Sequence, residues 1–246
     1  MKQAKNLLGV LGGLGPMSTF YFCELLTSHT KAERDADHMD MIISSRATTP
    51  DRTAFILGKS QSDPLPVMLE EAERLRAAGA TMLVIPCNTA HYFYDGLKKG
   101  CVLPILNIIE ETVRFLQARG VRTMGLLATD GTVQSRSYER ICRDVGMVCL
   151  TPDPKDQSVI SSIIYGSIKQ NKPVDRQAFL DVSDRLIARG CECLVLGCTE
   201  LSLLNRDKPL PPDLFVDSLE VLAYQTIRAC GKKPVGFPAI FDRCEV

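Results

Sequence analysis

The sequence has no tryptophan, only three histidines and no excess of either charge, because 29 basic residues balance 29 acidic ones among its 246 residues. A chain without net charge has no summed positive field that would gather nucleic acid or an anionic membrane surface. It also lacks any run close to the roughly 20 apolar residues of a membrane-spanning helix. We therefore expect no nucleic-acid partner and no membrane span, and a small molecule as the ligand.

An export signal is also missing from the pattern. The first apolar run breaks at Gly12 and Gly13 and leads into patterned sequence, which indicates a first strand rather than a signal peptide. We expect a soluble, cytoplasmic protein whose ten cysteines are free thiols. Cys191, Cys193 and Cys198 lack the paired C-x-x-C spacing of structural zinc, so no metal is expected.

Short apolar runs alternate with longer segments of helical period, which predicts parallel sheets with helices on their faces. The expected strands are 7–11, 41–43, 82–85 and 103–106 in the first half, and 123–127, 147–150, 194–196 and 214–216 in the second. Each half therefore looks like one four-stranded α/β unit.

The two halves also match residue by residue. The strings RLRAAGATMLVIPC and RLIARGCECLVLGC end at Cys87 and Cys198, with thirteen positions from arginine to cysteine in both. In each copy a helix is expected to end at a glycine with left-handed cap geometry, Gly79 or Gly190, before a buried strand runs to the cysteine. Both cysteines should thus lie at the carboxyl ends of equivalent strands.

These patterns predict two similar four-stranded, flavodoxin-like or Rossmann-like parallel-sheet domains related by a pseudo-twofold axis. The N-terminal domain is expected to comprise residues 1–107 plus 218–246, completed by the C-terminal helix, and the C-terminal domain residues 108–217. Because open parallel sheets bind ligands beyond the carboxyl ends of their strands, the active site should lie in the cleft between the domains. The two cysteines would then approach one ligand from opposite sides.

Such an arrangement suits inversion of a tetrahedral carbon, in which one face loses a proton and the other gains one. Each cysteine is expected at a strand-to-helix junction, where the helix N-terminus would lower the thiol pKa and bind a carboxylate. Asn88, Thr89 and Thr199 would add amide and hydroxyl donors, although helix capping accounts for each of them separately. His91 either reaches Cys87 across one helical turn or is a buried, hydrogen-bonded histidine.

Five short strings are spread along the chain: GGLGP at 12–16, PDRT at 50–53, PCNTAH at 86–91, ATDGT at 128–132 and GCTEL at 197–201. Together they resemble the aspartate/glutamate racemase superfamily, and most closely its aspartate racemases. The resemblance covers nearly the whole chain. It implies a homodimeric isomerase that interconverts L- and D-aspartate without pyridoxal phosphate or another cofactor, using one cysteine as thiolate and the other as thiol.

The resemblance also implies roles for individual residues. Cys87 and Cys198 match the catalytic pair, and Arg52 with Lys169 of YGSIKQ matches a clamp for the side-chain carboxylate of a dicarboxylic substrate. Glu200 stands where glutamate-type members usually have histidine. The remaining substrate-binding residues are expected to be Gly13, Leu14, Asn88, Thr89, Thr132 and Thr199. The glycine-rich loop at 12–15 does not satisfy G-x-G-x-x-G, which argues against a dinucleotide.

Other readings remain open. A broad-specificity or glutamate racemase is one alternative, and related scaffolds use the same two cysteine positions for maleate isomerisation, hydantoin racemisation or arylmalonate decarboxylation. Decarboxylases of this type lack one thiol, and both are present here. A non-catalytic amino-acid sensor is the alternative outside enzymes. A hydrolase built on Cys87 and His91 would leave Cys198 without a role.

Overall fold

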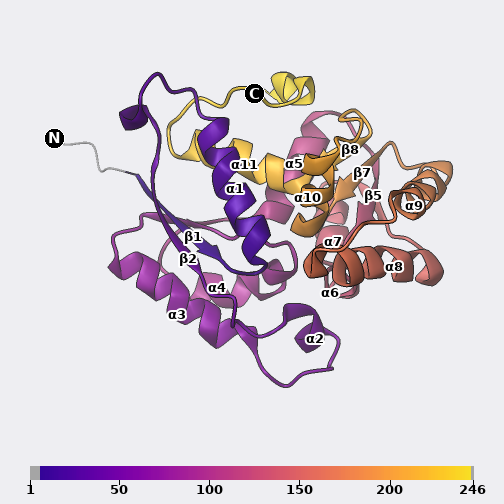
Figure 1. Cartoon of the computed structure of the whole chain (residues 1–246), viewed down its shortest axis with the longest axis horizontal. Helices are drawn as coiled ribbons and strands as arrows, with labels where there is room; N and C mark the ends of the chain where they lie inside the picture. Colours follow the sequence, from indigo (N-terminus) through magenta and orange to yellow (C-terminus); the bar gives the residue numbers. More distant parts are fainter. Residues whose placement is uncertain (1–5, 245–246) are drawn as a thin grey trace.

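Two four-stranded parallel sheets form the framework of the computed structural model, which describes residues 6–244 (Figure 1). The first sheet has the strand order β2-β1-β3-β4, with β1 at Leu7–Gly12, β2 at Asp40–Ser45, β3 at Met82–Val84 and β4 at Ile105–Leu106. The second has the order β6-β5-β7-β8, with β5 at Thr123–Leu127, β6 at Val148–Leu150, β7 at Cys193–Leu196 and β8 at Phe215–Asp217. The predicted α/β fold with two four-stranded parallel sheets is confirmed.

The same strand order in both sheets makes β3 and β7 equivalent. β3 lies between β1 and β4, with Leu8 opposite Met82, and β7 lies between β5 and β8, with Met124 opposite Cys193. All of these pairings are parallel, so the carboxyl ends of each sheet's strands meet at one edge. The repeat seen in the sequence is therefore a repeat of topology.

Helices connect the parallel strands in both halves. Those of the first half are α1 at Pro16–Ser28, α2 at Arg52–Ile56, α3 at Pro64–Ala77 and α4 at Tyr94–Gly100, together with the short 3₁₀ segments η1 at Asp35–Asp37 and η2 at Thr89–Phe93. The second half contains α5 at Ile108–Ala118, α6 at Asp130–Gln134, α7 at Ser137–Asp144, α8 at Pro154–Ser161, α9 at Arg176–Ala188, α10 at Thr199–Asp207 and α11 at Ser218–Ala229. A π-helical turn η3 at Ser162–Ser167 and a 3₁₀ turn η4 at Ile168–Gln170 follow α8, and η5 at Ala239–Cys244 is the last described element.

The glycines of the repeat have the backbone geometry that the sequence predicts. Gly79 follows α3 with φ of +101°, and Gly190 follows α9 with φ of +95°. Both helices thus end in a left-handed residue, a conformation that glycine adopts without steric cost. The chain then turns directly into β3 or β7.

The apolar core is divided into three parts. One cluster on each outer side packs the helices of a single half, as Leu75 and Leu83 do in the first and Leu186 and Leu194 in the second. The largest cluster lies between the two sheets and contains residues of both halves, including Phe22 of α1 and Leu222 of α11. The two halves therefore share a continuous core, which fixes their relative position.

Helix α11 takes part in both halves of this shared core. It packs against α1 and against α5, and Figure 1 shows it returning from the second half to lie beside α1. The division into residues 1–107 plus 218–246 and 108–217 stays a prediction. Within residues 6–244, none of the helices has the length and apolar character needed to cross a membrane.

Candidate active site

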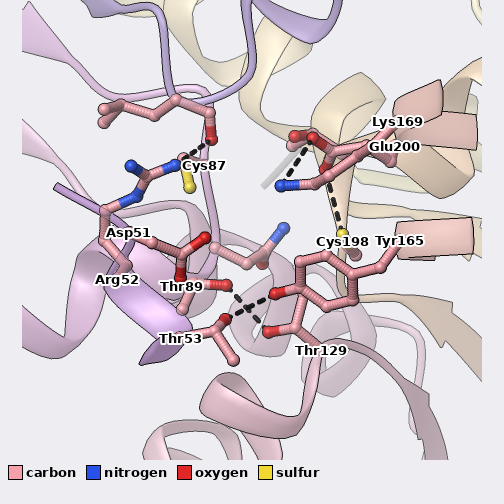
Figure 2. A pocket seen from close by; sticks show the side chains of 13 residues that line it. Asp51, Arg52, Thr53, Cys87, Thr89, Thr129, Tyr165, Lys169, Cys198 and Glu200 are labelled. Carbon is pink, nitrogen blue, oxygen red and sulfur yellow. Dashed lines mark hydrogen bonds and ion pairs between the residues drawn. The ribbon is translucent and has the colours of Figure 1, made fainter. Parts of the chain in front are cut away.

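A pocket lies where the carboxyl ends of β3 and β7 approach each other, and both predicted cysteines line it. Cys87 follows β3 after two residues, and Cys198 follows β7 after Gly197 and is the N-cap of α10. The pocket is lined by Leu14, Asp51, Arg52, Thr53, Cys87, Asn88, Thr89, Thr129, Tyr165, Lys169, Cys198, Thr199 and Glu200. Its free volume of about 10 Å³ is enough for about one water molecule. Figure 2 shows the two sulfur atoms reaching this pocket from different elements.

His91 fixes the backbone at Cys87. Its Nδ1 lies 2.8 Å from the Cys87 carbonyl oxygen, and its Nε2 accepts the N–H of Ile108 at 3.3 Å. The ring is therefore neutral with the proton on Nδ1, which donates to the carbonyl. Both ring nitrogens are engaged with the backbone and neither is available to the thiol. The interpretation of His91 as a buried, hydrogen-bonded histidine is confirmed. The hypothesis of a hydrolase built on Cys87 and His91 is not supported, because His91 cannot act as the general base for Cys87.

Cys198 lies beside an acid instead. Its thiol donates to Glu200 Oε2 at 3.1 Å, and Glu200 Oε1 forms an ion pair with Lys169 Nζ at 3.4 Å. Burial lowers the pKa of Lys169, but Glu200 and Cys198 raise it by more, so the net pKa of the ammonium is raised. Lys169 therefore stays positively charged, and the carboxylate of Glu200 partly neutralises that charge.

The thiol pKa values differ from the sequence expectation. Burial raises the pKa of the Cys87 thiol, and nearby Arg52 opposes the increase only in part. Burial raises the pKa of Cys198 further, and the Glu200 carboxylate adds to it. The expected lowering of the thiol pKa is wrong, because desolvation of the two thiols outweighs the nearby positive charges and backbone N–H groups that lower the pKa. At Cys87 the following helix is also only the five-residue 3₁₀ segment η2.

Arg52 is a buried cation without a carboxylate partner among the described residues. Only 9% of it is exposed, and its guanidinium donates to the carbonyl oxygens of Thr49, Pro50 and Leu14 at 2.8 to 3.2 Å. Its Nε is buried and has no partner at all. A desolvated guanidinium that is held by neutral acceptors is a natural binding site for a carboxylate.

The segment after α8 carries two further residues of the pocket. Tyr165 lies in the π-helical turn η3 and Lys169 in η4, where the Lys169 ammonium is 4.9 Å from the Tyr165 ring centroid. The Tyr165 hydroxyl donates to Thr53 Oγ1 at 2.7 Å. Since Thr53 belongs to α2, this hydrogen bond joins the two halves across the pocket (Figure 2). The wider π turn is of a kind often found at functional sites.

Three threonine hydroxyls meet on another side of the pocket. Thr89 Oγ1 is 2.9 Å from Thr129 Oγ1 and 3.0 Å from Thr132 Oγ1, and the last two are 3.1 Å apart. Thr89 and Thr129 line the pocket, but Thr132 does not, so it supports the other two from behind. Thr129, three residues before Thr132, caps α6 and lines the pocket, and the expected contact of Thr132 with a ligand stays a prediction.

Asn88 and Thr199 are both buried and both line the pocket. The Asn88 amide is already engaged, because its oxygen accepts the Tyr138 hydroxyl at 2.7 Å and its nitrogen donates to Ser218 Oγ at 3.0 Å. Ser218 Oγ in turn donates to the carbonyl of Leu196, at the end of β7. Asn88 thus couples the loop of Cys87 to the strand that leads to Cys198.

The glycine-rich loop after β1 is divided between two cavities. Leu14 lines the pocket of the cysteines, whereas Gly13 lines an adjoining, larger cavity. Gly13 has φ of +83°, and a side chain there would collide with the backbone of Arg46. The two residues of this loop that were expected to bind substrate thus border different cavities, and their contacts with a substrate stay a prediction.

Four lining residues were not among those expected: Asp51, Thr53, Thr129 and Tyr165. The first two lie in PDRT and Thr129 lies in ATDGT, so these strings marked the right loops without indicating which side chains face inward. Tyr165 begins the string YGSIKQ, which marked the segment for Lys169 but did not indicate that Tyr165 also faces the pocket, because the turn of η3 determines its direction. Across residues 6–244 no group of three or more His, Cys, Asp or Glu side chains is arranged to hold a metal ion.

The burial of His91 predicts how the free energy of unfolding depends on pH. Burial lowers the pKa of His91 to about 4, so between pH 6.5 and 4 the unfolded chain binds a proton that the folded chain does not. The free energy of unfolding should therefore fall by roughly 3 kcal/mol as the pH drops through this range. Urea unfolding at several pH values measures it. The His91→Gln variant should be less stable at pH 7 but should lack this fall in the free energy of unfolding. The control His29→Gln should retain it. An equal dependence of the unfolding free energy on pH in both variants and the wild type would contradict the assignment to His91.

Comparisons with known proteins identify the family of this chain. The family described as Asp/Glu/Hydantoin racemase matches residues 11–226. The "Broad specificity amino-acid racemase RacX" of Bacillus subtilis is 27% identical over 229 residues, which is 90% of this chain and 96% of that protein.

Solved structures give the same picture. The aspartate racemase of Picrophilus torridus superposes with a TM-score of 0.79 at 27% identity, covering 98% of this chain and 100% of its own. The glutamate racemase of Thermus thermophilus, solved with β-chloro-D-alanine, has the same fold, with a TM-score of 0.61 at 22% identity over 100% of this chain and 95% of its own. With the family pattern spanning most of the sequence and two thiols lining one pocket, this chain belongs to the Asp/Glu/hydantoin racemase family.

Proposed function

We propose that this isomerase interconverts L- and D-aspartate by two-base proton transfer between Cys87 and Cys198, without pyridoxal phosphate or another cofactor. One observation carries the proposal: cysteines from equivalent positions of two similar halves line a single pocket. A base on each face of the α-carbon is what inversion of its configuration requires.

The surroundings of the two thiols differ, which sets their roles in the free enzyme. Arg52 favours the thiolate of Cys87, whereas Glu200 accepts the hydrogen of the Cys198 thiol and opposes its ionisation. Cys87 thus loses its proton more easily and is the base. It takes the α-proton from one face of the substrate, and Cys198 gives its own proton to the opposite face. The product leaves a thiol at Cys87 and a thiolate at Cys198.

The electrostatic help comes from groups that are already in place. Arg52 would bind a substrate carboxylate, because its buried guanidinium has no acidic partner among the described residues. Lys169 would contribute a second positive charge on the Cys198 side. Fixed donors in a dry pocket stabilise the negative charge that develops on the carboxylate as the α-proton leaves. A dicarboxylic amino acid provides two anionic groups for these two cations, which favours a substrate of the class to which aspartate belongs.

Exchange in deuterated water tests the reaction. Incubation with L-aspartate and no added pyridoxal phosphate should incorporate α-deuterium and abolish optical rotation, as followed by NMR and polarimetry. Cys87→Ala and Cys198→Ala should each lower racemisation by at least about 10³-fold, because each removes one of the two groups that transfer the proton.

Cys101→Ala is the matched control, since Cys101 is half-buried and lies outside the pocket. It should racemise at the wild-type rate. An alanine variant of Cys87 or Cys198 with near-normal turnover would exclude two-thiol catalysis. Inertness of the wild type towards aspartate and glutamate would exclude the substrate.

Glu200 provides a separate test of the assigned roles. Replacing it by glutamine removes the charge that opposes the Cys198 thiolate, so the pKa of Cys198 should fall. The alkaline limb of the kcat/KM profile, where Cys198 loses the proton that it must donate, should therefore shift to lower pH. Glu73→Gln, an exposed glutamate of α3 paired with Arg76, should leave the profile unchanged. A shift in the opposite direction, or none, would refute the role given to Glu200.

We further propose that the protein acts in the cytoplasm as a homodimer. The support is the resemblance of the sequence to aspartate racemases. Sedimentation equilibrium measures the assembly: a mass near twice the 27.1 kDa of the chain is expected, and a mass of one chain at all concentrations would contradict it.

A further inference from the structure

An outer cavity of about 710 Å³ adjoins the pocket of the two cysteines. The two spaces share Asp51, Arg52, Lys169 and Glu200 as a common wall. The outer cavity is bounded by the loop after β1 with the start of α1, the segment after β2, the turn η4 and helix α10. Its volume is in the range of sites that hold ligands much larger than a four-carbon amino acid, roughly 300 to 1,000 Å³. Aspartate alone leaves this space without a role.

Two buried side-chain atoms of residues that border the outer cavity have no hydrogen-bond partner. One is the hydroxyl of Ser18, a residue that is only 1% exposed, and the other is Nε of Arg52, whose terminal nitrogens are bonded to backbone carbonyls. In the part of the chain that the structure describes, only two other buried side-chain atoms of this kind are found. A buried unpaired hydroxyl costs free energy unless a ligand or water satisfies it, so its presence here points to a ligand.

The charge around the outer cavity favours an anion. Four cationic side chains line it, Arg52, Lys169, Lys172 and Arg206, against the carboxylates of Asp51, Glu200 and Asp207. Lys169 pairs with Glu200 and Arg206 with Asp207, and no ion pair involves Arg52 or Lys172 within the described chain.

Helix α1 adds to this field. It is thirteen residues long, begins at Pro16 after Gly15, and no side chain caps its first turn. The N–H groups of that turn are left for water or a ligand, at the positive end of the helix dipole. Ser18 lies in this turn, so its free hydroxyl and the helix N-terminus act at one place.

Thr49 and Asn171 add polar groups to the lining, but a further part of it is apolar. Pro16, Met17, Ile168, Val174, Leu203 and Leu204 border the same space. Such a wall suits methylene groups between two polar ends, because contact with it removes apolar surface from water.

We propose that the outer cavity is a specificity subsite for the distal part of 2-amino dicarboxylic acids longer than aspartate. Their methylene chain lies along the apolar wall, and their terminal carboxylate binds at Ser18 and the first turn of α1. This inference rests on the proposed racemisation, since the α-carbon must lie between Cys87 and Cys198. It extends the substrates from aspartate to longer acids such as 2-aminoadipate and 2-aminopimelate.

The test compares kcat/KM for L-aspartate, L-2-aminoadipate and L-2-aminopimelate in the wild type and in Ser18→Ala. This change removes no hydrogen bond within the protein, because the hydroxyl has none, and thermal melting verifies the fold. The ratio of kcat/KM for the longer acids to that for aspartate should fall at least about tenfold in Ser18→Ala, through KM, because a hydrogen bond to a charged group is lost.

Ser158→Ala is the matched control: its exposed hydroxyl bonds Pro154 on α8, outside both cavities, and the ratio should not change. Failure of the wild type to bind the longer acids would overturn the subsite, as would an equal effect of Ser18→Ala on all three substrates. Calorimetric titration with 2-aminoadipate separates this inference from the reaction. If no amino acid is racemised but 2-aminoadipate binds and Ser18→Ala weakens it, the subsite stands and the proposed function fails.

Discussion

The arrangement of this site depends on a buried chain of hydrogen bonds that crosses from one half of the molecule to the other. The Tyr138 hydroxyl donates to Asn88, Asn88 donates to Ser218, and Ser218 donates to the carbonyl of Leu196. Each donor and acceptor is buried, so breaking one bond would leave an unsatisfied polar group away from water. The chain therefore holds the loop that bears Cys87 in a fixed position relative to the strand before Cys198, in a way that apolar packing alone would not specify.

The shared apolar core supplies the second part of this constraint. Side chains of α1, α5 and α11 pack between the sheets in one continuous cluster, which leaves the two halves little freedom to slide. The carboxyl ends of β3 and β7 are thereby kept close, and the pocket between them holds about one water molecule. The exclusion of water from the pocket raises the pKa of both thiols, which makes the thiolate base harder to form. It also strengthens every charge interaction within the pocket, which is what abstraction of a weakly acidic proton needs.

The two halves are similar in fold but differ in charge at the site. Cys87 lies near a guanidinium without an acidic partner among the described residues, and Cys198 lies against a carboxylate that is itself paired with Lys169. Duplication accounts for the matching strands, and the differing loops account for the asymmetry. The loop before α2 supplies Arg52 to one side, while the turn after η3 supplies Lys169 to the other. A symmetric scaffold thus carries two thiols that differ in how easily they ionise.

The sequence by itself determined the α/β class, the four strands of each half and the placement of the two cysteines after equivalent strands, because apolar periodicity, the glycines at 79 and 190 and the matched spacing are all local signals. It also marked the loops of Arg52 and Lys169 through short strings. Only the tertiary structure decided that Thr129 rather than Thr132 borders the pocket, that Tyr165 reaches Thr53, and that His91 binds backbone groups. The physical reason is that side-chain direction and desolvation depend on neighbours far apart in the chain. For the same reason the sequence predicted a lowered thiol pKa, whereas burial by both halves raises it.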